Sequence, residues 1–413
     1  MAKNLKKFVN PRFLKAVDLS LLRRLFDRHS GQLRGLDLGL LARDPDRGRQ
    51  ALLDFFAGPE QNYPRGLVAD LHRIAEVGTR AGMDMLLERA RAMNVVLVPA
   101  QDAAAAEHRI EPKHLALRAF LDHLAVFNAA SDLVALMRLT SLGEFAGLDE
   151  GVEPRLDEET RKAFEQAAGR LFEADLHGNY CRVGWYEDDD EIKVVVTHGT
   201  PITTVPVVEG GEERIISFTT TEQAVLSYSA SAGRLKVGGV SKARCADFAE
   251  MFAAIMLERP KFFAAPDAQE LYTLKPIEAA GFGFTFDHAF DPTIRRIQIV
   301  EAQANRITAD PRSGEERRSW SLTMRDNSNA LFRLGSEARR IIFSQDGHCL
   351  NHIVFRVQIE PEGERPARLT VKLKPPGSAI FKRERFEGQI MTLLRRNGLC
   401  REREHRDLAA AAQ

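Results

Sequence analysis

The sequence has few cysteines, and the four that are present are widely separated: Cys181, Cys245, Cys349 and Cys400. This is unlike the dense cysteine framework of small secreted domains, so we expect reduced thiols. Long apolar runs are also missing, because charges or prolines interrupt each hydrophobic stretch before the roughly 18 residues that a membrane helix needs. No apolar signal-peptide core can be placed in the basic N-terminal segment. These absences favour a cytoplasmic protein that does not enter a membrane.

An excess of charge of one sign is missing as well, since 58 lysines and arginines balance 58 aspartates and glutamates. The whole chain therefore does not require a polyanionic partner, and any argument from charge must be local. Neither a Gly-x-Ser-x-Gly motif nor a Walker loop occurs, and Gly281-Phe-Gly-Phe lacks the third glycine of a dinucleotide loop. The sequence gives no support to a serine hydrolase or to a nucleotide hydrolase.

Apolar residues at helical spacing dominate the chain up to about residue 174. The chain has 413 residues, enough for two or three domains. We predict a helical domain over residues 1–150, and we expect Asp157 to be the N-cap of a further helix. The predicted helices lie near residues 12–29, 46–56, 67–76 and 82–92, and one apolar stripe runs from Leu117 to Phe127.

The hydrophobic period changes from helical to alternating after His177, which predicts β-hairpins. A helix with its N-cap at Ser241 should follow them and bury Cys245 on its apolar face. Residues 151–290 are therefore predicted as a second domain. Since no βαβ alternation is evident, the fold class is α+β, a helical N-terminal half followed by antiparallel β-hairpin and helix regions. The hairpin strands are predicted at 180–186 with 191–196, at 202–208 with 214–219 around Gly210-Gly211, and at 224–229 with 234–240.

Residues 291–413 are predicted as a third domain, a basic β-hairpin unit with a C-terminal helix. Asp346-Gly347 is a favoured pair for a two-residue turn, so we expect it to join strands at 341–345 and 350–359. Alternation in the second of these strands places His352, Arg356 and Gln358 on a solvent-exposed face. A further strand at 369–373 should precede the closing helix, with Gly398 as its C-terminal cap.

Three segments carry a resemblance to other proteins: Tyr228-Ser-Ala-Ser-Ala-Gly-Arg-Leu-Lys-Val, Tyr272-Thr-Leu-Lys-Pro-Ile and Leu369-Thr-Val-Lys-Leu-Lys-Pro-Pro-Gly-Ser. In this order, after a helical first half and before a closing helix, they resemble a group of uncharacterised bacterial proteins of about 400 residues. The resemblance covers most of the chain. It implies the same order of structural regions, and it implies no activity and no catalytic residue.

The C-terminal region is strongly basic. Residues 365–406 hold twelve lysines and arginines against four acidic residues, whereas residues 149–191 hold fourteen acids against five bases. Clustered cations of this kind are typical of phosphate-binding surfaces, although they can also be solvated or paired with the acidic segment. Along the strand at 369–373 the cations should lie opposite the apolar residues. The predicted nucleic-acid-binding residues are Arg368, Lys372, Lys374, Lys382, Arg383, Arg385, Arg395 and Arg396.

An alternative interpretation is a divalent-metal-dependent nuclease. In restriction-like nucleases, an acidic residue near one strand and a Glu-x-Lys on the next converge on Mg²⁺ or Mn²⁺. Asp175 precedes the first predicted hairpin strand, and Glu191 and Lys193 lie on the second. Against this interpretation, Glu191 belongs to an acidic turn, and Glu-x-Lys is common by chance.

A second candidate site is the cluster His348, Cys349 and His352, because imidazole and thiolate are zinc ligands. No nearby residues supply a fourth ligand unless His177 and Cys181 fold against the cluster. A histidine pair on the solvent-exposed face with a packed cysteine is the simpler explanation, so we expect no metal here.

These observations predict a non-catalytic accessory or scaffold protein without a cofactor. Its helical half should contact a protein partner, and its basic C-terminal surface should contact nucleic acid. The nuclease remains the competing hypothesis, with Mg²⁺ or Mn²⁺ as its cofactor. A third possibility is a protein-binding component whose acidic and basic segments pair with each other.

Overall fold

The structure is a computed structural model, and it confirms the predicted α+β class, with helices and three antiparallel sheets. The chain divides into two compact units, Met1–Ala135 and Leu136–Gln413. The domain boundaries near residues 150 and 290 remain predictions. The described residues are 13–14, 17–29, 33, 36–58, 63–98, 111–138, 142–188, 191–209, 211–309, 315–338, 341–343, 347–361, 366–382 and 386–401.

The first unit is helical, as predicted. Asp18, Asp37, Asp44 and Thr79 cap helices by accepting a hydrogen bond from a backbone N–H of the first turn. Across the described part of the chain, no helix is both long enough and apolar enough to span a membrane. The helices are α2 (Leu19–Asp27), α3 (Leu38–Arg43), α4 (Pro45–Ala57), α5 (Arg65–Val77), α6 (Arg80–Ala92), α8 (Pro112–Asp122) and α9 (Leu124–Arg138).

The apolar stripe from Leu117 to Phe127 does not form one helix. At His123 the backbone leaves the helical conformation, with φ −138° and ψ 59°, so that α8 ends and α9 begins. Phe120 and Phe127 still meet edge to face, with ring centroids 5.1 Å apart. The spacing predicted which side chains would meet, and it missed the break between them.

The first sheet of the second unit has the strand order β1-β7-β6-β3-β2, and all its pairs are antiparallel. The predicted hairpins β2–β3 and β6–β7 are confirmed; the turn residues 189–190 lie outside the described residues. Strand β1 was not predicted, because its four residues lie inside the expected helical domain and gain their structure by pairing with β7. The strands are β1 (Gly143–Ala146), β2 (Cys181–Asp188), β3 (Glu191–Gly199), β6 (Thr221–Ser229) and β7 (Arg234–Gly238).

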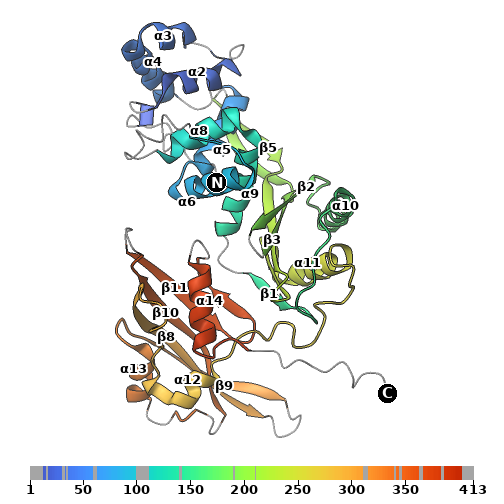
Figure 1. The fold of residues 1–413 in the computed structure, drawn as a ribbon, viewed down its shortest axis with the longest axis vertical. Helices are drawn as coiled ribbons and strands as arrows, with labels where there is room; N and C mark the ends of the chain where they lie inside the picture. The colour runs from blue at the N-terminus through green and yellow to red at the C-terminus, as the bar shows by residue number, and fades with distance from the viewer. Residues whose placement is uncertain are drawn as a thin grey trace. The chain divides into compact units, whose positions relative to one another are not determined.

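Two helices, α10 (Glu158–Ala174) and α11 (Lys242–Ile255), cover one face of the first sheet (Figure 1). Asp157 caps α10 and Ser241 caps α11, as predicted. The central strands are also buried on their second face, where the side chains of Val195 and Val225 are each 1% exposed. Residues in these strands therefore alternate between two buried faces.

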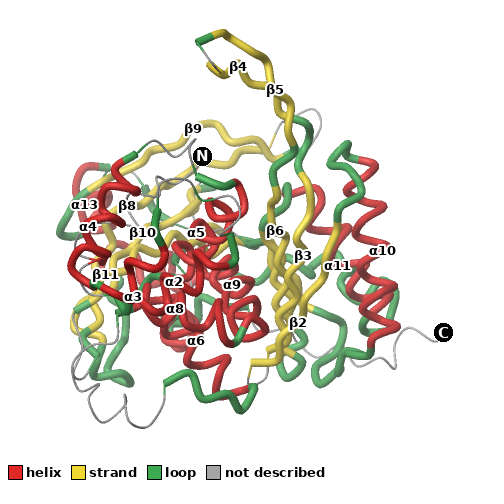
Figure 2. Tube along the Cα trace, turned by 90° about the horizontal axis from the view of Figure 1, so that it is seen from above, coloured by secondary structure: helices red, strands yellow, loops and turns green. Residues whose placement is uncertain are grey.

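The predicted hairpin around Gly210-Gly211 is confirmed as a separate two-stranded sheet of β4 (Thr203–Glu209) and β5 (Glu212–Phe218). It is inserted between β3 and β6, and it extends well beyond the ends of those strands (Figure 2). Gly211 has φ +88°, which glycine adopts without a Cβ penalty. Gly210 lies outside the described residues.

The second sheet has the strand order β12-β11-β10-β8-β9, again entirely antiparallel. Helices α12 (Lys275–Ala280), α13 (Ala330–Glu337) and α14 (Glu387–Arg396) contribute to the core beneath it. As predicted, Gly398 ends the last helix, with φ +66°. The strands are β8 (Ile294–Ala309), β9 (Glu316–Arg325), β10 (His348–Ile359), β11 (Ala367–Lys374) and β12 (Ser378–Ile380).

The hairpin predicted at Asp346-Gly347 is wrong. Residues 341–343 are not a strand; instead Ile341 and Phe343 are buried in the core beneath the second sheet. Strand β10 pairs with β8 on one side and β11 on the other, so the neighbours that satisfy its backbone come from elsewhere in the sequence. Gly347 has φ +73° and accepts a hydrogen bond from the N–H of Ile307. Asp346 lies outside the described residues.

Candidate nucleic-acid interface

The second sheet buries only one of its faces. On β10, the side chains of Ile353, Phe355, Val357 and Ile359 are 0% exposed and lie in the core with α14. The alternation predicted for β11 is confirmed, because Leu369, Val371 and Leu373 are buried while Arg368 and Lys374 are exposed. The opposite side of the sheet, which we call the open face, consists of Arg296, Gln298, Glu301, Arg325, Val354, Arg356, Gln358, Arg368, Thr370, Lys372 and Lys374.

Strand register arranges the open face in rows that cross the sheet. Directly opposite residues share a face, and neighbouring strands are about 4.8 Å apart. Cations from four strands are therefore side by side on one surface, although they are far apart in the sequence. From β11 through β10 to β8, the rows are Arg368 with Gln358 and Arg296, Thr370 with Arg356 and Gln298, and Lys372 with Val354 and Glu301, and Arg325 of β9 lies opposite Glu301.

Most of these cations are not neutralised. Among the residues that the structure describes, the side chains of Arg296, Arg368, Lys372 and Lys374 form no hydrogen bond or ion pair. Glu301 is the acidic residue of the rows, and it accepts a hydrogen bond from Nε of Arg325 at 2.6 Å. Exposed cations without acidic partners raise the local positive potential and attract polyanions. The open face is therefore electrostatically suited to phosphates.

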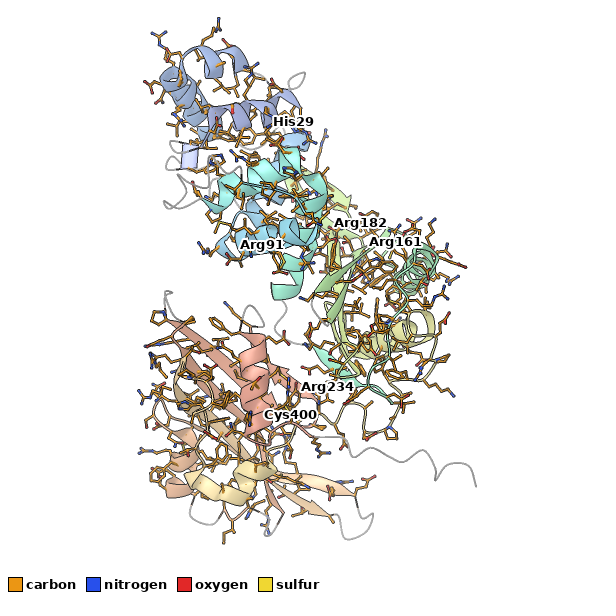
Figure 3. All side chains as sticks on the ribbon, in the orientation of Figure 1. His29, Arg91, Arg161, Arg182, Arg234 and Cys400 are labelled. Carbon is orange, nitrogen blue, oxygen red and sulfur yellow. The ribbon has the colours of Figure 1, made fainter. Side chains whose placement is uncertain are left out.

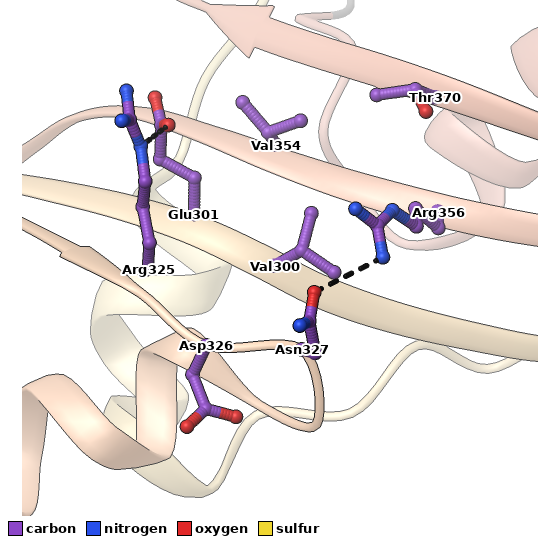
Figure 4. Close-up of a pocket in the computed structure, with 8 residues that line it drawn as sticks. All are labelled: Val300, Glu301, Arg325, Asp326, Asn327, Val354, Arg356 and Thr370. Atoms are coloured by element: carbon purple, nitrogen blue, oxygen red, sulfur yellow. Dashed lines mark hydrogen bonds and ion pairs between the residues drawn. The ribbon is translucent and has the colours of Figure 1, made fainter.

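A pocket of about 340 Å³ opens on this face (Figure 4). Val300 and Val354 form an apolar patch in it, and the guanidinium groups of Arg325 and Arg356 lie to either side. Arg356 donates a hydrogen bond to Oδ1 of Asn327 at 3.3 Å. Thr370 and the two carboxylates of Asp326 and Glu301 complete the lining. The pocket thus combines two guanidinium groups and two carboxylates with an amide, a hydroxyl and a small apolar surface, so its own charges balance.

The neighbours of Glu301 favour its ionised form. Its Oε1 lies 2.8 Å from Nε2 of His352, and Nδ1 of His352 lies 3.2 Å from the amide nitrogen of Asn351. The hydrogen bond from His352, followed by that from Arg325, lowers the pKa of Glu301. The prediction that His352 is solvent-exposed is wrong, because its side chain is buried at a bulge between Leu350 and His352.

The structure does not bring the whole predicted basic set together. Arg395 and Arg396 are exposed in the last turn of α14, which packs on the core side of the sheet, opposite the open face (Figure 1). Lys382 is exposed just after β12. Arg383 and Arg385 lie outside the described residues. The prediction from local sequence therefore combined cations that belong to different sides of the fold.

The residues of the alternative nuclease site are also separated. Asp175 follows α10 and accepts a hydrogen bond from Nε of Arg244 at 2.8 Å, which lowers the pKa of the Asp175 carboxyl. It lies two residues before His177, which contacts Gly199 at the end of β3. Glu191 is at the opposite end of β3, roughly 25 Å away for a strand of this length.

Glu191 has its own partners in the first sheet. It accepts hydrogen bonds from Oγ of Ser227 at 2.7 Å and from Nζ of Lys236 at 2.9 Å. Lys193 lies two residues further along β3, opposite Ser227. These contacts stabilise the pairing of β3 with β6 and β7, and they do not bring Asp175 near Glu191 and Lys193.

The candidate zinc ligands lie at the start of β10. His352 is occupied by Glu301, while the ring of His348 packs against Trp320 with centroids 5.5 Å apart. Burial raises the pKa of Cys349, which disfavours the thiolate that binds zinc. Within the described ranges, no group of three or more His, Cys, Asp or Glu side chains is arranged to hold a metal ion.

The thiols do not form an activated nucleophile. Cys245 is 6% exposed in the core of the first sheet, as predicted. Burial raises the pKa of Cys181 and of Cys400 to about 11, so both are protonated at neutral pH. Cys400 follows α14, and Arg234 of β7 lies in the same region (Figure 3).

Sequence reasoning missed Arg296 and Arg325 because a sheet neighbour need not be a sequence neighbour. Arg356 could have been included, since alternation along β10 already placed it opposite the apolar face.

Comparison of the chain with models of known protein families and with curated proteins gives no match.

Proposed function

We propose that the protein is a non-catalytic accessory protein that binds nucleic acid through the open face of the second sheet. The observation that carries the proposal is the continuous row arrangement of Arg296, Arg356, Arg368 and Lys372, of which only Arg356 has a partner among the described side chains. Phosphates supply most of the binding energy of such interfaces and release counterions when cations contact them.

Aromatic residues do not contribute to the rows of the open face, so base stacking is not part of the proposal. Contacts to the backbone position a nucleic acid without selecting its sequence. We therefore expect binding that varies little with base sequence.

A protein partner for the helical first unit is the second part of the proposal. Met93 and Val96, at and beyond the end of α6, are 44% and 73% exposed. We propose these two apolar side chains as part of the contact surface. A cytoplasmic location remains part of the proposal, supported by the scattered cysteines.

The test is a fluorescence anisotropy titration of labelled single- and double-stranded DNA and RNA against the purified protein at several salt concentrations. Contact of phosphates with Arg296, Arg356, Arg368, Lys372 and Lys374 predicts that log K falls with log salt with a slope of about −3.5 to −4.5. Absence of binding at low salt would contradict the proposal and leave the protein-binding scaffold.

The same samples, incubated with Mg²⁺ or Mn²⁺ and run on a denaturing gel, test the nuclease alternative. We expect the nucleic acid to remain intact. Metal-dependent cleavage that disappears in Glu191→Ala would overturn the non-catalytic assignment.

A further inference from the structure

The hairpin of β4 and β5, which we call the arm, concentrates exposed apolar side chains. Soluble proteins rarely leave such side chains together in water unless they bind something. A two-stranded hairpin is also only marginally stable in isolation. Both facts make the arm a candidate surface for pairing with another chain. The exposed fractions are 74% for Val208, 74% for Ile215, 41% for Ile216 and 39% for Phe218, and Ile202, just before β4, is 72% exposed.

These side chains emerge on both faces of the arm. Ile215 lies opposite Pro206 and shares its face with Val208. Ile216 lies opposite Val205, and Phe218 lies on the same face as Ile216. A partner that packed against one face would leave the other in water. A strand added to an edge gives new cross-strand neighbours on both faces at once.

The two edges of the arm are not equivalent. A proline within a sheet lies with its nitrogen toward the open edge, so Pro206 removes a hydrogen-bond donor from the outer edge of β4. Strand β5, with the sequence Glu-Glu-Arg-Ile-Ile-Ser-Phe, has no proline. Because Ile215 lies opposite Pro206, its N–H and C=O also point outward, as do those of Glu213 and Ser217 two residues on either side.

We propose that the partner is a second copy of this chain, which pairs with β5 through its own β5 in antiparallel orientation about a two-fold axis at Ile215. The two Ile215 residues exchange both backbone hydrogen bonds. The arms then form one four-stranded sheet, in which Ile215 on one face and Ile216 and Phe218 on the other gain neighbours from the second chain.

The side chains of β5 can pair in this register. Counting outward from the axis, Arg214 lies opposite Ile216 of the second copy, Glu213 opposite Ser217, and Glu212 opposite Phe218. No two like charges are directly opposed, and the Ser217 hydroxyl can donate a hydrogen bond to the Glu213 carboxylate. An isologous interface of this kind closes as a dimer and does not propagate.

The experiment measures the mass of the full chain by size-exclusion chromatography with light scattering over a range of concentrations. We expect a species of twice the chain mass of 46.2 kDa that dissociates on dilution. Ile215→Lys should raise the dimer dissociation constant by about tenfold or more, because each copy loses a covered isoleucine and the two lysines oppose each other. A wild-type monomer at all concentrations would overturn the proposal.

Val208→Lys is the matched control, since Val208 has the same exposed fraction and face as Ile215 but lies on the strand that contains Pro206. It should leave the dimer largely intact. Equal effects of the two substitutions would exclude pairing through β5.

Cysteine substitution tests the register. Opposed residues that exchange both backbone hydrogen bonds have Cα atoms about 5.5 Å apart, within disulfide range. With a mild oxidant, Ile215→Cys should give a covalent dimer on a non-reducing gel, whereas Val208→Cys and the wild-type chain should not. Absence of the crosslink in a folded Ile215→Cys variant, whose secondary structure is checked by circular dichroism, would contradict the two-fold axis at Ile215.

Discussion

The two five-stranded sheets share an antiparallel architecture but differ in how many faces they bury. In the first sheet, Val194 and Val195 are neighbours on β3 with opposite orientations, and both are at most 1% exposed. In the second sheet, Phe355 is buried while its neighbour Arg356 is exposed. A strand buried on both faces can carry few charged side chains, because unpaired charges are costly in the interior. Of the two sheets, the second is therefore the one with a face that can carry exposed cations.

The largest expected effect is the difference in stability loss between substitutions on the two faces of β10. Phe355→Ala leaves a cavity beside Phe286, whose ring centroid is 4.6 Å away, and should lower the free energy of unfolding by about 3–5 kcal/mol. Arg356→Ala, on the open face, should change the free energy of unfolding by about 0.5 kcal/mol or less.

Fluorescence can measure these changes in the second sheet. The chain has two tryptophans, Trp185 in the first sheet and Trp320 in the second. In a Trp185→Phe background, urea unfolding followed at Trp320 reports the second sheet. Similar losses of unfolding free energy for Phe355→Ala and Arg356→Ala would contradict the assignment of a buried and an open face.

A matched pair of valines compares the second faces of the two sheets directly. Val195→Ala in the first sheet should cost about 2 kcal/mol, because its side chain is buried. Val354→Ala on the open face should cost about 0.5 kcal/mol, since water already reaches it. The two urea midpoints, measured with Trp185 and Trp320 respectively, provide the comparison, and equal shifts would remove the distinction between the sheets.

The sheets should also respond to acid at different pH values. Burial of His198 in the first sheet, with the charge of His177 as a smaller cause, lowers the pKa of His198 below its ordinary value of 6.5. The unfolded chain then binds more protons than the folded chain below pH 6.5. The contribution of His198 to the free energy of unfolding is therefore fully present above that pH, and it is lost as the pH decreases toward the folded pKa. The slope is up to about 1.4 kcal/mol per pH unit.

In the second sheet, protonation of Glu301 also lowers the stability as the pH falls, but it does so at a lower pH than protonation of His198. The pKa of Glu301 is held below its ordinary value of 4.5, so its contribution is present above that pH and is lost only as the pH falls further. The urea midpoint should therefore be lower at pH 5.5 than at pH 7.5, and this decrease should come from His198 and not from Glu301. His198→Phe, which keeps a ring stacked on Phe172, should abolish the difference.

Much of the fold could be predicted from local patterns. The hairpins around residues 189–190, 210–211 and 231–233 followed from alternation and turn residues, and the caps Asp157 and Ser241 followed from their side-chain chemistry. What failed depended on distant partners. Strand β1 forms because it pairs with β7, and the prediction of a hairpin at Asp346-Gly347 failed because β10 pairs with β8 and β11.

The candidate interface shows the same division. Periodicity placed Arg368, Lys372 and Lys374 on the face opposite the core, which is a property of one strand. The addition of Arg296 and Arg325 required the order of strands in the sheet. The exclusion of Arg395 and Arg396 required the packing of α14, which periodicity cannot supply.

The most direct test compares two variants that remove the same charge from opposite sides of the second sheet. Arg368→Gln/Lys372→Gln changes the open face, and Arg395→Gln/Arg396→Gln changes α14. We expect the slope of log K against log salt for labelled nucleic acid to become less steep by about 2 in the first variant, because each lost phosphate contact removes about one unit. The slope should be unchanged in the α14 variant. Equal changes in both variants, or a change only in the α14 variant, would contradict the account.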